Sequence, residues 1–148
     1  MKNKKFIVKG FTLIEIMLVI ALVLTVGFFS TAFPLRLMSQ TAVRDSAEEF
    51  KNVLWKAQAY AIAGRQHSSW GVHYGNSVVT LFKGNDYNNR EQSFDEKTTI
   101  ADRVSVSGFS DTIFSIPGGR PQSAIADVIL TRDNLMDSFS LNSEGLIE

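Results

Sequence analysis

The chain has 148 residues, which is enough for one ordinary domain with an apolar segment and too few for two large cores. Its 15 basic and 15 acidic residues give a formal net charge of zero, so no overall field favours nucleic acid as a partner. No cysteine is present, which excludes disulfides, thiol catalysis and zinc sites built on thiolates.

The N-terminus is basic, and no acidic residue accompanies its four lysines before the first apolar segment. These are Lys2, Lys4, Lys5 and Lys9. By the positive-inside rule, they keep the N-terminus in the cytoplasm and predict that the remainder of the chain is translocated.

A segment that is apolar except for a few residues runs from Phe11 to Phe33, just before Pro34. As a helix it would be about 35 Å long, enough to span a bilayer, so a transmembrane helix is predicted. The alternative is an ordinary secretory signal, with cleavage after Ala32. Pro34 predicts either a kink or melted stretch in a long helix, or simply the end of one helix.

Glu15 is an acidic residue within this apolar segment, which holds no basic residue. A carboxylate at the centre of a bilayer costs roughly 2.5 to 3.5 kcal/mol, so Glu15 needs a partner. Cleavage between Gly10 and Phe11 would create one, because the new α-amine of Phe11 would be a cation. It would neutralise Glu15 of its own or an adjacent subunit.

The stretch KGFTLIE at Lys9–Glu15, followed by the apolar segment, resembles the prepilin signal of type IV pilins and type II secretion pseudopilins. The resemblance implies that residues 1–10 are a leader peptide, and that a prepilin peptidase cleaves after Gly10 and methylates the amine of Phe11. It also implies that Glu15 pairs with the Phe11 amine of a neighbouring subunit during assembly.

The same resemblance implies the partners and the location of the chain. The partners are the prepilin peptidase, other pilin or pseudopilin subunits, an inner-membrane assembly platform and membrane lipid. The expected location is the inner membrane, with a single pass, a cytoplasmic N-terminus and the head outside, followed by the filament.

Beyond Pro34, apolar residues recur at alternating intervals of four and three. This stripe consists of Val43, Ala47, Phe50, Leu54, Ala57 and Ala61. It predicts an amphipathic helix over residues 34–64, with Gly64 at its C-terminus.

From Ser68 onward, alternation of apolar and polar residues predicts strands. Residues 70–74 and 78–82 flank Gly75-Asn76-Ser77 as an expected hairpin, and residues 84–92 are expected to form a polar, exposed loop. Further strands are predicted at 97–100, 103–107, 112–116, 127–131, 138–142 and 146–148.

The predicted fold class is α+β. A long N-terminal α-helix, transmembrane in residues 11–33 and amphipathic in residues 34–64, packs on an antiparallel β-sheet or small β-sandwich. The strands form a globular head over residues 65–148.

Two C-terminal segments, residues 114–121 and 139–147, are similar to the pattern of GspH/FimT-type minor pseudopilins. That pattern is a strand, a glycine-rich turn with an arginine, a strand and a closing hairpin. Together with Trp70 after the helix, this resemblance covers most of the chain. The absence of cysteine departs from the disulfide-closed C-terminal region common in major type IV pilins.

No catalytic constellation is recognised, so the sequence predicts no enzyme, no cofactor and no metal. His67 and His73 lack acidic neighbours at ligand spacing. Gly118-Gly119-Arg120 has no helix after it to help hold a phosphate, so a tight turn is expected. Four residues could surround Ca²⁺, but they match no EF-hand and turns explain them as well: Asp127, Asp133, Asn134 and Asp137.

The sequence therefore predicts a structural subunit that assembles through its N-terminal helix into a pilus, type II secretion or competence filament. One alternative is a binding module on the filament that holds DNA or an exported substrate; the other is a signal-anchored exported protein. Five scattered arginines could contact DNA but form no basic cluster: Arg65, Arg90, Arg103, Arg120 and Arg132.

Overall fold

The computed structural model describes residues 10–32 and 34–148, and for residues 29–32 and 34–40 it describes the backbone alone. The chain divides into two compact units, with the boundary between Met38 and Ser39. The lysines of the leader and Phe33 lie outside the described residues.

Helix α1 (Leu13–Ala32) is the main element of the first unit. Thr12 caps its N-terminus, because the backbone N–H of Glu15 donates to Thr12 Oγ1 at 3.4 Å. Thr25 Oγ1 donates to the carbonyls of Ala21 and Leu22, both at 2.9 Å, so this hydroxyl is satisfied within the helix.

In residues 10–32 and 34–148, no helix is both long enough and apolar enough to cross a membrane. The membrane-spanning segment expected over residues 11–33 is thus not shown by the described part of the chain, and it stays a prediction.

Helix α2 (Pro34–Ile62) begins two residues after α1 ends at Ala32. The structure therefore gives two helices, and the position between them, Phe33, lies outside the described residues, so the kink, melted stretch or helix end expected at Pro34 stays a prediction. Proline has no backbone N–H and clashes with the preceding turn, but it fits the first residue of a helix, where it stands here.

The predicted stripe of α2 is confirmed, because all six of its residues are buried in the head. The predicted C-terminus is confirmed as well: the helix ends at Ile62, and Gly64 adopts a left-handed conformation with φ of 58°. The backbone N–H of Gly64 donates to the carbonyl of Ala61 at 3.0 Å.

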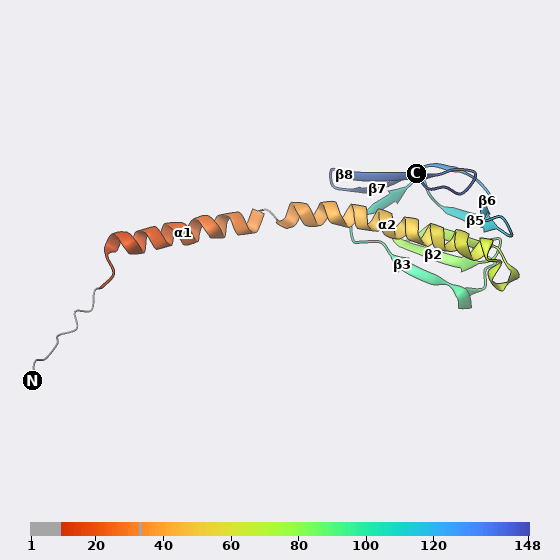
Figure 1. Ribbon diagram of the computed structural model, residues 1–148, viewed down its shortest axis with the longest axis horizontal. Helices are drawn as coiled ribbons and strands as arrows, with labels where there is room; N and C mark the ends of the chain where they lie inside the picture. The colour runs from red at the N-terminus through yellow and green to blue at the C-terminus, as the bar shows by residue number, and fades with distance from the viewer. Residues whose placement is uncertain (1–9, 33) are drawn as a thin grey trace, which may run out of the picture. The chain divides into compact units, whose positions relative to one another are not determined.

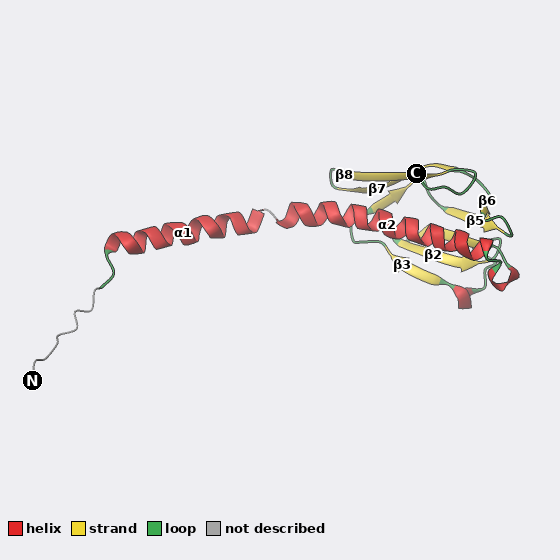
Figure 2. Cartoon of the chain, in the orientation of Figure 1, coloured by secondary structure: helices red, strands yellow, loops and turns green. Residues whose placement is uncertain are grey.

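Two antiparallel sheets form the rest of the second unit, and strands of both lie beside α2 (Figures 1 and 2). The five-stranded sheet has the order β3-β2-β1-β5-β6, and the three-stranded sheet has the order β4-β7-β8. The strands are β1 (Trp70–Gly75), β2 (Val78–Lys83), β3 (Glu96–Thr99), β4 (Ser105–Ser107), β5 (Asp111–Ser115), β6 (Arg120–Pro121), β7 (Ile125–Arg132) and β8 (Leu135–Leu141). Two short 3₁₀ helices, η1 (Arg65–His67) and η2 (Gln92–Phe94), precede β1 and β3.

The hairpin predicted around Gly75-Asn76-Ser77 is confirmed as β1 and β2. Asn76 and Ser77 have φ of 54° and 60°, the left-handed pair that a tight hairpin turn requires. No strand is assigned at 146–148, so that prediction is wrong; the segment makes a bridge from Ile147 to Leu141, and Glu148 exchanges backbone hydrogen bonds with Ser140. Strand β6 is not predicted by the sequence, because it is two residues long.

The core lies where α2 packs on both sheets. Phe50 of α2 contacts Phe109 and Phe139, with ring centroids 4.9 and 5.6 Å away. Nearer the end of α2, Tyr60 meets the buried Trp70 edge to face at 4.9 Å. Aromatic pairs of this geometry contribute stability beyond the burial of their apolar area, so they help to fix α2 on the sheets.

Candidate functional site

The predicted processing site lies just before α1. Gly10, Phe11 and Thr12 are outside any helix or strand, and Phe11 is 79% exposed. No described atom lies within 4 Å of the position that a Cβ of Gly10 would take. A peptidase would therefore meet this peptide bond as an open, non-helical segment.

Glu15 lies in the first turn of α1, where the helix dipole carries its positive end. No charged residue follows it before Arg36. The large apolar side chains of the helix are exposed: Leu13, Ile14, Ile16, Met17, Leu18, Val19, Ile20, Leu22, Val23, Leu24, Val26 and Phe28. This end of the chain thus combines one acidic group with a long apolar surface. The pairing of Glu15 with a Phe11 amine involves a second subunit and stays a prediction.

The glycine-rich turn at residues 118–120 packs on α2. Gly119 has φ of 63°, its N–H donates to the carbonyl of Ser115 at 2.8 Å, and an added Cβ would overlap with Ile62. The expected tight turn is confirmed. Only glycine fits at position 119, because the helix leaves no room for a side chain.

The closing turn at residues 142–146 reaches the same part of α2. An added Cβ at Gly145 would overlap with the Gln58 amide, and that amide donates from Nε2 to the carbonyl of Gly119 at 3.2 Å. The two turns are further joined by an ion pair of 2.9 Å between Arg120 and Glu144. The two segments of the second resemblance therefore meet at Gln58, a residue that sequence patterns do not single out.

The residues weighed as metal ligands do not come together. His67 lies in η1, whereas His73 lies in β1. Along the hairpin of β7 and β8, Asp133 is at the turn and Asp137 pairs with Leu130. In the part of the chain that the structure describes, no group of three or more acidic or histidine residues could hold a metal ion.

The arginines weighed for DNA binding are mostly held by neighbours within the head. The Arg65 guanidinium lies 4.0 Å from the centroid of the Tyr60 ring. Arg90 Nε donates to Asp95, and Arg120 pairs with Glu144. Arg65, Arg90 and Arg120 thus each contact another side chain of the head.

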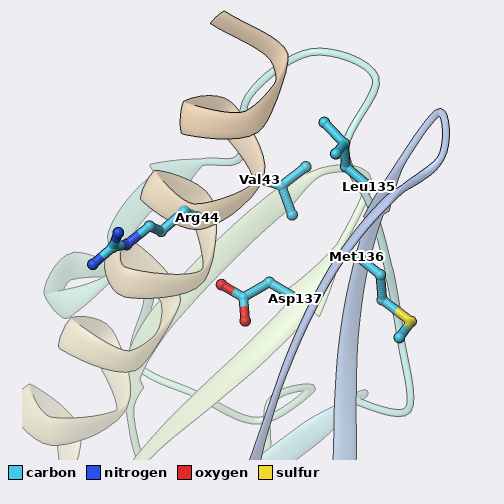
Figure 3. A pocket seen from close by; sticks show the side chains of 5 residues that line it. All are labelled: Val43, Arg44, Leu135, Met136 and Asp137. Carbon is cyan, nitrogen blue, oxygen red and sulfur yellow. The ribbon is translucent and has the colours of Figure 1, made fainter. Parts of the chain in front are cut away.

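A groove of about 230 Å³ lies between α2 and the start of β8 (Figure 3). Val43 and Leu135 flank it, the Asp137 carboxylate points toward α2, and the Arg44 guanidinium and Met136 point away. Pockets for small molecules usually enclose about 300 to 1,000 Å³. This groove is smaller, so it does not identify a ligand site.

No protein-family model, curated protein or solved structure matches this chain.

Proposed function

We propose that this chain is a structural subunit, a minor pilin or pseudopilin, of a type IV pilus, type II secretion or competence filament. A prepilin peptidase cleaves it after Gly10, and it assembles through its N-terminal helix. Before cleavage and assembly the chain resides in the inner membrane, with its leader lysines in the cytoplasm. The observation that carries the proposal is the combination of an open Gly10–Phe11 bond, Glu15 in the first helical turn, and an exposed apolar helix behind it.

The apolar surface of α1 supports assembly because such a surface is unfavourable in water. Burial of apolar area contributes about 25 cal/mol per Å², and soluble monomers rarely expose long continuous patches. Lipid or the helices of other subunits would cover α1 in the proposed cycle.

Glu15 supports a defined register between subunits. An unpaired carboxylate in apolar surroundings is costly, and the methylated amine of Phe11 in a neighbouring subunit would offset that cost. Since α1 carries no other charge, this pair can form at only one offset between the two helices.

The outer face of α2 supports a second contact between subunits. Trp55 and Ile62 are 47% and 56% exposed, and the exposed Ala59 lies between them at helical spacing. These residues lie beside the buried stripe, and Ile62 also borders the turn at Gly119, so over its last turns α2 carries exposed apolar area outside the stripe. A neighbouring subunit of the filament would cover this face.

The proposed processing is tested by intact-mass measurement of the chain from cells with and without a prepilin peptidase. With the peptidase, the chain should begin at Phe11 and carry one added methyl group. Gly10→Leu should block cleavage, whereas the matched change Gly27→Leu within α1 should not. Cleavage after Ala32 instead would establish an ordinary secretory signal and overturn the proposal.

A further inference from the structure

The segment 84–95, which we call the strap, folds back along the five-stranded sheet. The backbone N–H of Gly84 donates to the carbonyl of Ser69 at 3.0 Å, and the N–H of Glu91 donates to the carbonyl of Lys83 at 3.4 Å. Lys83 also pairs with Glu91 at 2.8 Å. The sequence predicts a polar, exposed loop here, but Tyr87 and Arg90 are half-buried.

Tyr87 holds the strap to the sheet through two ring contacts. Its ring stacks on His73 of β1, with centroids 3.6 Å apart and an interplanar angle of 18°. It meets the buried Phe82 of β2 edge to face at 5.4 Å. The Arg90 guanidinium lies 3.8 Å from the centroid of the same ring.

Arg90 is fixed in this position by groups of the strap itself. Its Nε donates to both carboxylate oxygens of Asp95, at 3.1 and 3.0 Å, and its Nη1 donates to the carbonyl of Tyr87 at 2.8 Å. The side chains of Arg90 and Asp95 are only 12% and 6% exposed. The cation therefore cannot move away from the Tyr87 ring without breaking a buried ion pair.

The charges that face His73 come from two elements. From β5, its pairing partner Asp111 favours the protonated ring, and from the strap, Arg90 disfavours it. The neighbour from β2 is the uncharged Thr80. Burial is the largest effect on His73, and the net result is a pKa below the usual 6.5.

We propose that the strap is a pH-sensitive element, closed over the sheet while His73 is neutral and released when His73 is protonated. A protonated His73 would bring a second cation to the ring that Arg90 already covers, at a half-buried position. Opening the strap gives the imidazolium access to water and separates it from Arg90. Because the closed form disfavours the proton, the open population rises as the pH falls below 6.5. This inference does not depend on the proposed filament function.

The test is hydrogen exchange of the full chain in detergent, analysed as peptide fragments at pH 7.5 and pH 5 and corrected for the intrinsic exchange rate. In the wild type, protection of residues 84–95 should fall several-fold at pH 5, while the hairpin of β7 and β8 stays protected. His73→Phe keeps a stacking ring but cannot titrate, so its strap should stay equally protected at both pH values.

Asp111→Asn sharpens the test, because it removes the anion that favours protonation of His73. The loss of protection should then shift to a lower pH than in the wild type. Strap protection that does not change with pH in the wild type would overturn the proposal, as would an equal loss in His73→Phe. Protection in the hairpin of β7 and β8 shows in every sample that the head is folded.

Discussion

α1 and α2 have 20 and 29 residues, and they differ in whether their apolar side chains are buried or exposed. In α2, the six apolar residues of one stripe are at most 3% exposed, because the sheets of the same chain cover them. In α1, large apolar side chains are exposed from Leu13 to Phe28. The stripe of α2 is thus covered within the second unit, whereas the described side chains of α1 are exposed, and we propose that lipid or another subunit covers them.

The same substitution in each helix gives the largest expected difference. Leu54→Ala removes a fully buried side chain from α2 and should cost about 2 to 5 kcal/mol of unfolding free energy. Leu18→Ala in α1 should change the unfolding of the head by less than about 0.5 kcal/mol, because Leu18 is exposed. Urea unfolding of the full chain in detergent, followed by fluorescence of the buried Trp70, measures both. Equal losses would show that the head depends on α1.

Glycines in the two regions should also respond differently to alanine. Gly119→Ala forces a Cβ into Ile62 at a positive φ and should cost about 1 to 3 kcal/mol. Gly27→Ala in α1 meets no described atom within 4 Å and raises helix propensity, by up to about 1 kcal/mol. The same unfolding experiment compares them. A stable Gly119→Ala variant would mean that the turn does not need to pack on Ile62.

The exposed ion pair of α2 should give the smallest effect. Glu96→Gln removes the partner of Lys56, and because both side chains are nearly half exposed, the cost should stay within about 1 kcal/mol. The hydrogen bond to Glu96 raises the pKa of Lys56 above its ordinary 10.5. The contribution of the pair is therefore present below pH 10.5 and is lost as the pH rises further. A loss of unfolding free energy above about 1 kcal/mol at neutral pH would show that this ion pair, in addition to the buried stripe, stabilises the packing of α2.

Much of the head could be predicted from the sequence because its signals are local. The stripe of α2 is visible as a spacing of three and four, and Asn76-Ser77 marks the first hairpin. Strand pairs that are distant in sequence, such as β1 with β5, cannot be predicted from local signals. Nor can the contact of Gln58 with Gly119, which joins residues 61 positions apart.

The strap shows a second limit of sequence patterns. Its polar composition predicts exposure, yet Tyr87 is half-buried on His73 and Phe82 of the sheet, and Arg90 is half-buried against Tyr87 and Asp95. At the N-terminus, prediction from the sequence is limited for another reason. Gly10, Phe11 and Glu15 lie close together in the sequence, so their motif can be recognised there, but the group proposed to pair with Glu15 belongs to another chain.

The most direct test of assembly through α1 is the share of processed chain that enters the filament when Glu15 is neutralised. Glu15→Gln keeps the shape of the side chain and removes its charge, and Glu49→Gln makes the same change on the exposed surface of α2. We expect normal cleavage for both variants and a reduced sheared or cross-linked filament fraction for Glu15→Gln alone. Filament incorporation of Glu15→Gln equal to that of wild type and Glu49→Gln would contradict a role of the Glu15 charge in assembly.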